Sequence, residues 1–377
     1  MKERYYSLDV FRGITVAFMI LVNNPGSSHT YEQLEHTYWN GWTLTDLVFP
    51  FFLFAVGNAL SFVMPRLQAA GQAVFLKKVF KRFALIFLIG LFMFWFPFVY
   101  WSGNSLQWIP WHDVRIMGVL QRIAIAYLLA SLIIYYFKNR GALIISVLIL
   151  LVYGFICYYY DAGNNPYAFG VAFDTSIIGE SHMYKERGVL FEPEGFASSL
   201  TPVVQVILGY FVGWHIQRLG KKSLLVVQLL FAGAALVALA YFANIYTPIN
   251  KRIWTSSYVL LTTGLATILL SILIYFFEIK NVKGWGSKFF DAFGKNPLFI
   301  YVLSAVIPRL MWLIKIPTHI ESGVQQYTNP LSWFYDHICV QAFSKEQNAS
   351  LMYAIIYVLL LWLIAWWMDK RKVYIKV

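Results

Sequence analysis

The sequence predicts an all-α fold, a polytopic bundle of transmembrane helices with both termini in the cytoplasm. Of its 377 residues, 59% are hydrophobic and 13% are charged, whereas a soluble domain usually carries about 25% charged residues. Long apolar runs recur along the chain, and each is close to the roughly 20 residues that a helix needs to cross the hydrocarbon core. Basic residues are concentrated in alternate loops, as the positive-inside rule predicts for a membrane protein.

The apolar runs predict about ten membrane-spanning helices. They are continuous, whereas a transmembrane β-barrel shows short segments of alternating hydrophobicity. In chain order, the expected spans are Val10–Asn24, Thr43–Met64, Phe83–Tyr100, Met117–Phe137, Ala142–Tyr160, Leu200–Ile216, Leu224–Phe242, Ser256–Phe277, Pro297–Leu313 and Leu351–Trp367. The basic loops between them are too short for a soluble domain, so residues 1–377 are expected to form one transmembrane domain.

The charge pattern predicts the orientation of this bundle. The chain carries 30 Lys and Arg residues and a net charge of +12. Twenty of these cations lie on the N-terminal side of the first span or in alternate loops, and the other loops hold seven. Because the richer set faces the cytoplasm, an even number of spans leaves both termini there. Topology thus explains the net charge; no nucleic-acid partner is expected, and a bacterial inner membrane with its lipid is the expected location.

Polar residues gather around the first outer loop, between the first two spans. A loop of about 18 residues returns the chain, so His36 and Asp46 are expected to lie within reach of each other. A histidine oriented by a carboxylate is a competent general base, because its pKa lies near neutral pH and the acid fixes its tautomer. Asn23, at the end of the first span, can donate to a developing oxyanion.

Two other interpretations of this loop remain open. Asp46 follows Thr43 by three residues, so it can be an acid in the first turn of a helix, and His36 can be a solvated loop residue. No metal site is expected, because His29 and His36 lack the spacing of four residues that places two ligands on one helix face, and no cysteine is near.

A series of short motifs runs in order along nearly the whole chain. They are residues 7–14 (SLDVFRGI), 35–42 (EHTYWNGW), 46–50 (DLVFP), 115–122 (RIMGVLQR), 182–184 (HMY), 191–195 (FEPEG), 248–251 (PINK) with Trp254, and 294–297 (GKNP). Together these motifs resemble those of the heparan-α-glucosaminide N-acetyltransferase family.

This resemblance implies a membrane acetyltransferase that moves an acetyl group from cytoplasmic acetyl-CoA to the amine of a terminal glucosamine-type sugar at the non-cytoplasmic face. It assigns the general base to His36 and supporting roles to Asp46 and Asn23. Direct attack on the thioester and an acetyl-His36 intermediate are both compatible with it. The lysosomal enzyme has an extra N-terminal lumenal domain, so heparan sulfate is not carried over as the acceptor. The first outer loop is slightly longer here, which leaves Asn24 as an alternative to Asn23.

Four residues are candidates for binding acetyl-CoA. Arg12, at the inner mouth of the first span, can pair with a CoA phosphate or simply set the topology. Arg122 lies beside Gln121 within the fourth span, where an unpaired charge is costly. Arg122 can therefore hold an acceptor carboxylate, contact the thioester region, or pair with an acid such as Asp46 as scaffold. Asn296 precedes a proline at a span start and can expose backbone groups in a cavity or simply begin a helix.

The candidate acceptor residues are Trp39, Asn40, Glu194 and His182. Glu194 can bind a sugar amine or act as an acid near a helix N-terminus. Two alternative functions are an amino-sugar transporter and an O-acyltransferase of a cell-envelope polysaccharide. The expected partners are an amino-sugar or glycan acceptor and membrane lipid, with a homodimer left open.

Overall fold

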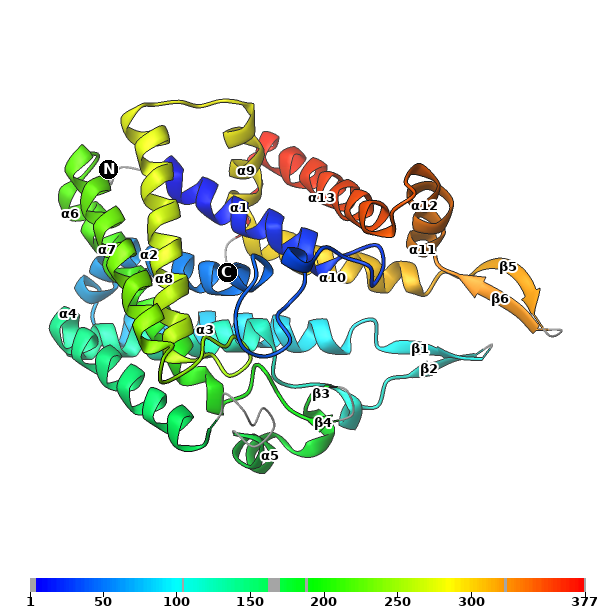
Figure 1. Cartoon of the computed structure of the whole chain (residues 1–377), viewed down its shortest axis with the longest axis horizontal. Coiled ribbons are helices and arrows are strands. Elements are labelled where there is room, and N and C mark those ends of the chain that lie inside the picture. Colours follow the sequence, from blue (N-terminus) through cyan, green and yellow to red (C-terminus); the bar gives the residue numbers. More distant parts are fainter. Residues whose placement is uncertain (1–4, 104, 162–169, 187–188, 322–323, 376–377) are drawn as a thin grey trace.

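The computed structural model describes residues 5–103, 105–161, 170–186, 189–321 and 324–375, and helices dominate it (Figure 1). The long helices are α1 (Tyr6–Asn23), α2 (Val48–Ala69), α3 (Gln72–Trp95), α4 (Val119–Tyr159), α6 (Leu200–Leu219), α7 (Ser223–Ala243), α8 (Ser256–Ile274), α9 (Trp285–Lys295), α10 (Pro297–Trp312) and α13 (Glu346–Lys370). The short ones are α5 (Val171–Ile178), α11 (Pro330–Phe334) and α12 (Val340–Ala342). The basic residues Lys2, Arg4, Arg187 and Lys376 lie outside the described residues.

Seven of the described helical segments are long and apolar enough to cross a membrane. They are Tyr6–Asn23, Thr45–Ala69, Val119–Tyr159, Ala197–Leu219, Ser223–Ala243, Ser256–Ile279 and Glu346–Lys370. The pair α9 and α10, whose axes meet at 82° across a short break, is an eighth candidate. The predicted helical membrane bundle is thus confirmed, whereas the number of ten spans and the orientation of the termini stay predictions.

One long helix accounts for two expected spans. The segments 117–137 and 142–160 both fall largely within α4, which is 41 residues long. Lys138 interrupts this helix with a positive φ of 56°, so α4 consists of two helical halves joined at a kink. The basic residues of the expected loop lie at this kink instead of in a separate turn.

Three small antiparallel hairpins depart from the all-α prediction. β1 (Val99–Ser102) pairs with β2 (Ser105–Trp108), β3 (Lys185–Glu186) with β4 (Val189–Leu190), and β5 (Ile316–Glu321) with β6 (Val324–Thr328). The expected span 83–100 was therefore too long at its end: α3 stops at Trp95, and the chain leaves as β1. Pro97 cannot continue a helix, because it has no N–H to donate. Lys315 joins two of the hairpins by donating to the carbonyl of Gly103 at 2.8 Å, so β1–β2 and β5–β6 project from the same end of the bundle (Figure 1).

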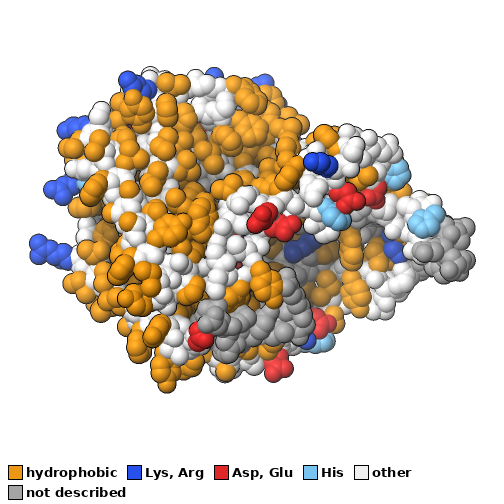
Figure 2. Space-filling view, in the orientation of Figure 1, with side chains coloured by type: hydrophobic (Ala, Val, Ile, Leu, Met, Phe, Trp, Pro, Cys, Tyr) orange, Lys and Arg blue, Asp and Glu red, His pale blue; other side chains and the backbone are white. Residues whose placement is uncertain are grey.

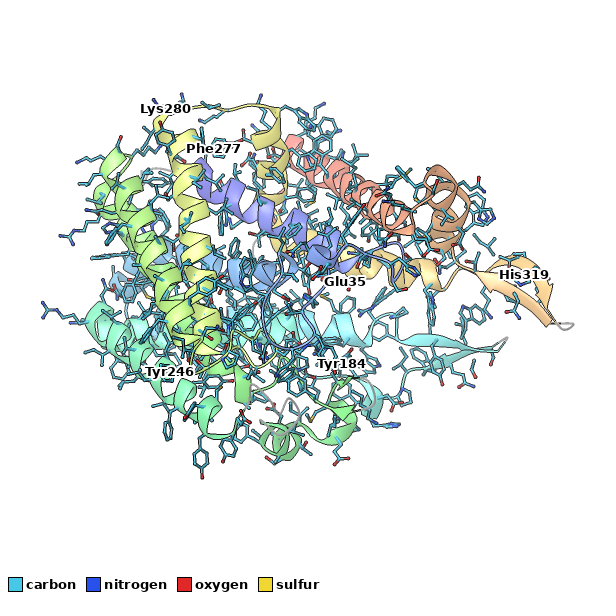
Figure 3. The ribbon with its side chains drawn as sticks, viewed as in Figure 1. Glu35, Tyr184, Tyr246, Phe277, Lys280 and His319 are labelled. Carbon is cyan, nitrogen blue, oxygen red and sulfur yellow. The ribbon has the colours of Figure 1, made fainter. Side chains whose placement is uncertain are left out.

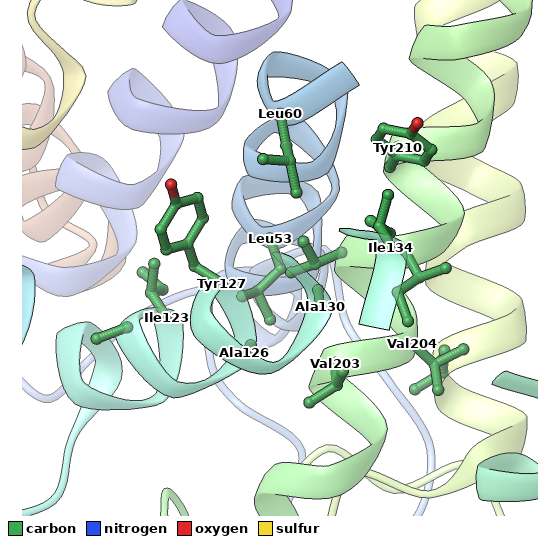
Figure 4. Close-up of a cluster of buried hydrophobic side chains, with 14 of the residues drawn as sticks. Leu53, Leu60, Ile123, Ala126, Tyr127, Ala130, Ile134, Val203, Val204 and Tyr210 are labelled. Atoms are coloured by element: carbon green, nitrogen blue, oxygen red, sulfur yellow. The ribbon is translucent and has the colours of Figure 1, made fainter. Parts of the chain in front are cut away.

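The core that positions the site lies between α2, α4 and α6 (Figure 4). Leu53 and Leu60 of α2 face small and branched side chains of the other two helices. α2 and α6 touch through their backbones: a Cβ added at Gly57 would lie 2.0 Å from the carbonyl oxygen of Val206, and one added at Gly209 would lie 2.3 Å from that of Phe54. Small residues allow this close approach, which is a common way to pack helices in membranes.

The two ends of the bundle differ in charge and in structure. At one end, Tyr6 donates to Ser287 at 3.2 Å and the amide of Asn296 donates to the carbonyl of Val373 at 2.9 Å. The start of α1, the α8–α9 turn and the segment after α13 therefore share one end, where Figure 3 labels Lys280. The loop from α1 to α2, α5 and the hairpins occupy the other end (Figure 1). In Figure 2, many Lys and Arg side chains project from the upper and left edges, whereas the visible acids and histidines lie toward the right and bottom.

Candidate active site

The loop between α1 and α2 brings His36 and Asp46 into contact. Asp46 lies in the short 3-10 turn Thr45–Leu47 that precedes α2, and its side chain is fully buried. His36 reaches it from the middle of the loop, with Nδ1 2.7 Å from Oδ1 of Asp46. The His36 side chain is itself 45% exposed, so the ring is partly open to a substrate. The structure thus shows the expected proximity of the two side chains, and their catalytic roles stay proposals.

The carboxylate of Asp46 is held in one orientation. Its Oδ2 atom accepts hydrogen bonds from the backbone N and Oγ1 of Thr37, at 3.3 and 3.0 Å, and from the backbone N and Oγ1 of Thr43, at 3.0 and 3.2 Å. Its Oδ1 atom is thereby turned toward His36. Because a carboxylate only accepts, Nδ1 of His36 carries the shared proton, and Nε2 retains the lone pair of a base. Asp46 therefore pairs with Thr43 at a helix start and also orients a histidine.

Lys251 enters the same site from the loop between α7 and α8. Its Nζ atom lies 2.8 Å from Nδ1 and 3.2 Å from Nε2 of His36, and 3.4 Å from Oδ1 of Asp46. Burial lowers the pKa of Lys251 below its ordinary value, although Asp46 and Glu194 act in the opposite direction. The sequence did not single out this lysine as a site residue. The one indication was its place in the motif 248–251, within an outer loop that otherwise carries few cations.

These side chains line a cavity of about 110 Å³. Three separate segments contribute to it, namely the α1–α2 loop, the segment before α6 and the α7–α8 loop. The lining residues are His36, Thr37, Asp46, Pro193, Glu194, Lys251, Arg252 and Trp254. The cavity therefore combines a base, two carboxylates, two cations and an indole, a set that suits a small polar substrate with an amine.

Arg115 holds the acidic wall of the cavity. Its guanidinium donates from Nε to Glu192 at 2.9 Å and from Nη2 to Glu192 and to Glu194, the latter at 2.6 Å. Burial disfavours the charged form of Arg115, but the two glutamates outweigh it and raise its pKa above the ordinary value. Burial also raises the pKa of Glu192. Glu192 is fully buried at its side chain, whereas Glu194 is 17% exposed toward the cavity.

Arg122 supports the same segment from within α4. Its Nη2 atom donates to the carbonyl of Pro193 at 2.6 Å and also to Ser198 Oγ. The guanidinium carbon lies 5.0 Å from the centre of the Trp254 ring, a cation–π distance. The partners of Arg122 are backbone and hydroxyl oxygens instead of Asp46. These contacts are those of a scaffold residue, and its role at the site stays a prediction.

Comparison with known proteins tests the predicted resemblance. A family model described as "Heparan-alpha-glucosaminide N-acetyltransferase, catalytic" matches residues 4–177. The heparan-alpha-glucosaminide N-acetyltransferase of Homo sapiens is 27% identical over 361 residues, which covers 80% of this chain and 53% of that protein. The protein of the same name from Mus musculus is 25% identical over 394 residues, covering 88% of this chain and 58% of that protein. The predicted family resemblance is confirmed.

The matches cover only part of the relatives and, for the family model, only part of this chain. The chain spans just over half the length of the curated relatives that it matches. The family match at residues 4–177 includes His36, Asp46 and Arg122 but ends before Glu194 and Lys251. The part of the cavity that the α7–α8 loop provides thus rests on the geometry of this structure.

Of the four candidate acceptor residues, one is among the described residues that line the cavity and three are not. Glu194 lines the cavity. Trp39 packs edge-on against Phe191, with ring centres 5.7 Å apart, and Asn40 accepts from the amide of Asn250 at 3.2 Å. His182 donates from Nδ1 to a backbone carbonyl at 2.7 Å. Trp39, Asn40 and His182 are therefore neighbours of the cavity wall or lie beyond it, and are not among its described lining residues.

Asn23 lies away from the described lining of the cavity, so its predicted role as oxyanion donor gains no support from its position. It ends α1 as an exposed residue and is not among the described residues that line the cavity. Asn24, the alternative, donates its amide back to the carbonyl of Ile20 at 2.9 Å. Spacing alone could not show this, because the direction in which the loop leaves α1 depends on its packing against later segments such as Ser350, which accepts from the backbone N of Ser27 at 3.2 Å.

Two cavities that share lining residues lie at the other end of the bundle, around Arg12. Their volumes are about 220 and 80 Å³, and Arg12, Ala55 and Ala59 line both. Arg12 pairs with Asp9 in the first turns of α1. Arg82 of α3, which the sequence did not single out, lines the smaller cavity. Two cations therefore face a hollow at the end of the bundle opposite His36.

The other two candidates for binding acetyl-CoA, Gln121 and Asn296, are not among the described residues that line these cavities. Gln121 is fully buried against Gly90 of α3. Asn296 is fully buried between α9 and α10, where its amide donates to Val373 and its Oδ1 atom accepts from the backbone N of Ile375 at 2.8 Å. Its observed contacts hold the segment after α13. Within the described ranges, no group of three or more His, Cys, Asp and Glu side chains is close enough to hold a metal ion.

Proposed function

We propose that this protein transfers an acetyl group from acetyl-CoA to the amine of an amino-sugar acceptor. The observation that carries the proposal is the hydrogen bond between His36 and the buried Asp46 at a cavity that also contains Glu194. A histidine oriented in this way can take a proton from an ammonium group. The Glu194 side chain is 17% exposed and lines the cavity, where its negative charge suits a cationic acceptor.

The proposed reaction is direct attack of the amine on the thioester. Nε2 of His36 removes a proton from the acceptor ammonium, and the free amine attacks the thioester carbonyl. The tetrahedral intermediate loses the second amine proton to solvent and expels the CoA thiolate, so the C–S bond breaks once the C–N bond has formed. The thiolate takes the proton from His36. Asp46 stabilises the imidazolium that forms between these steps. Trp254 is our candidate oxyanion donor in place of Asn23, because it lines the cavity and its buried Nε1 has no hydrogen-bond partner among the described residues.

The donor would enter from the opposite end, through the cavities around Arg12. Arg12 and Arg82 are suited to the phosphates of CoA. Ala55, which lines these cavities, follows Asp46 by nine positions, or about 14 Å along the helix at 1.5 Å per residue. The flexible pantetheine arm of CoA is long enough to carry a thioester over such a distance. We propose that this donor end faces the cytoplasm of a bacterial inner membrane and that the acceptor arrives from outside.

Proteoliposomes with acetyl-CoA inside and glucosamine outside test this function. We expect His36→Ala to lower acetylation of glucosamine by roughly 10²–10⁴, the usual cost of losing a general base. The matched control is His29→Ala, because His29 lies in the same loop but pairs with Glu346 at 2.7 Å, away from the cavity. Unchanged acetylation by His36→Ala would refute the assignment. Equal loss in both variants would show that the loop, and not the base, is what the activity needs.

A further inference from the structure

The ammonium of Lys251 lies where a reacting amine is needed. In the site described above, Nζ lies beside the His36 ring, 2.8 Å from Nδ1 and 3.2 Å from Nε2, the nitrogen that the pairing with Asp46 leaves as a base. Nζ is also 3.4 Å from the Asp46 carboxylate. An acceptor ammonium would need the same two neighbours, a base for its proton and a carboxylate for its charge. Lys251 thus occupies the position and makes the contacts of the proposed substrate.

We propose that Lys251 holds the place of the acceptor amine, and that the site acetylates Lys251 itself when acetyl donor is present without an acceptor. This inference rests on the proposed acetyl transfer, because the same base and donor carry out both reactions. It also gives the acceptor class a structural basis: the site is arranged around a primary ammonium group, which favours transfer to nitrogen over transfer to a hydroxyl.

The chemistry balances with the groups at the site and the donor. Nε2 of His36 takes a proton from the Lys251 ammonium, and the Nζ lone pair attacks the thioester carbonyl. A C–N bond forms, the C–S bond breaks, and the CoA thiolate leaves with the proton held by His36. The second proton lost from Nζ on amide formation goes to solvent. The product is a neutral amide on Lys251 and free CoA.

The surroundings of Lys251 favour such a reaction. Burial lowers its pKa, so more of the amine is unprotonated at a given pH than for a free lysine side chain. The backbone beside it is fixed, because Oδ1 of Asn250 accepts from the backbone N of Arg252 at 2.8 Å and of Ile253 at 3.2 Å. Only the flexible four-carbon stem needs to move for Lys251 to leave the base when an acceptor arrives. Its side chain is 16% exposed, and Lys251 is one of the residues that line the cavity.

Acetylation of Lys251 would inactivate the site. The amide is larger than the ammonium, it has no charge to pair with Asp46, and it would fill part of a cavity of about 110 Å³. An acceptor amine displaces Lys251 from His36 and so protects it. We therefore expect the protein to lose activity slowly in acetyl-CoA alone and to be protected by glucosamine.

The experiment uses the full chain in liposomes permeable to both substrates. The protein is incubated with acetyl-CoA alone, with acetyl-CoA and glucosamine, and as His36→Ala with acetyl-CoA alone. Peptide mass spectrometry then measures acetylation at Lys251 and, as an internal control for spontaneous reaction, at the exposed Lys345. We expect acetylated Lys251 in the first sample, protection in the second, and a loss of roughly 10² or more in the third. Acetylation at Lys345 should be equal in all three.

The outcomes separate this inference from the proposed function. Turnover of glucosamine with Lys251 acetylated no more than Lys345, or acetylated equally in His36→Ala, overturns the inference and leaves the function standing. Absence of both products overturns both. A second variant, Lys251→Arg, keeps the charge but cannot form the amide. Its own initial rate should survive preincubation with acetyl-CoA, while the unmodified protein loses activity. Equal time-dependent loss in both would also overturn the inference.

Discussion

Replacing Asp46 by asparagine is the sharpest test of the proposed base, because the structure fixes how the new amide would sit. Oδ2 accepts four hydrogen bonds, two of them from the backbone N–H groups of Thr37 and Thr43. Backbone N–H groups cannot be rotated away, so the asparagine oxygen must take this position. The amide NH₂ then takes the place of Oδ1 and donates to Nδ1 of His36. The imidazole has to accept there, its proton moves to Nε2, and the base lone pair is lost.

The expected cost follows from this forced change of tautomer. The corresponding Asp→Asn exchange in a serine-protease triad leaves the geometry intact and lowers kcat by about 10⁴. We expect a similar loss for Asp46→Asn, roughly 10³–10⁴ in acetylation rate, which corresponds to about 4–5.5 kcal/mol of transition-state stabilisation. The fold should survive, since the four hydrogen bonds at Oδ2 are retained.

The assay is acetylation of glucosamine in proteoliposomes, with the thermal unfolding midpoint as the control for folding. Groups that act as one unit give non-additive losses. The double variant of His36→Ala with Asp46→Asn should therefore be little worse than either alone. Activity of Asp46→Asn within tenfold of the unmodified protein would refute the reasoning about the tautomer. Additive losses in the double variant would show that Asp46 acts without His36.

Three other perturbations test the scaffold and the cavity. Gly57→Ala should lower the thermal unfolding midpoint by forcing α2 away from the α6 backbone, at a cost of about 1–3 kcal/mol. Gly286→Ala in α9, where an added Cβ meets no atom within 4 Å, should not lower the midpoint. Arg115→Met should destabilise by about 3–5 kcal/mol, because the buried Glu192 and the partly buried Glu194 lose their partner. Arg115→Lys should restore only part of this stability, because lysine cannot pair bidentately. Full stability of Arg115→Met in a thermal melt would contradict the ion-pair network. Labelling of Lys251 by acetic anhydride should begin at lower pH than labelling of a free lysine side chain, because an amine with a lowered pKa is deprotonated at lower pH. A labelling midpoint at or above that of free lysine would contradict the effect of burial.

Hydropathy predicted most of the helices, and loop length predicted the pairing of His36 with Asp46. Each expected span overlaps a helix, because an apolar stretch of that length has few other ways to satisfy its backbone in lipid. The pairing of His36 with Asp46 followed from a short loop that joins two neighbouring helix ends. Both inferences depend on residues that are close in the sequence, where the chain itself limits the distance.

Contacts between distant segments could not be predicted in this way. Lys251 lies 215 positions after His36, and their meeting depends on how the α7–α8 loop folds across the α1–α2 loop. The hairpin β1–β2 was missed because its aromatic residues continue the apolar character of α3, so hydropathy alone does not mark where the helix ends. Asn23 is adjacent in sequence to the site loop, yet it remains outside the cavity.

The contacts of Asn296 attach the segment after α13 to the end of the bundle where acetyl-CoA is proposed to bind. Asn296 binds Val373 and Ile375, and the residue before it, Lys295, pairs with Asp369 at 2.8 Å. The next residue, Pro297, lines a cavity proposed for acetyl-CoA. An affinity tag fused after α13 would therefore pull on the first turn of α10, so tagged protein should differ from untagged protein in its KM for acetyl-CoA before any difference arises in chemistry at His36.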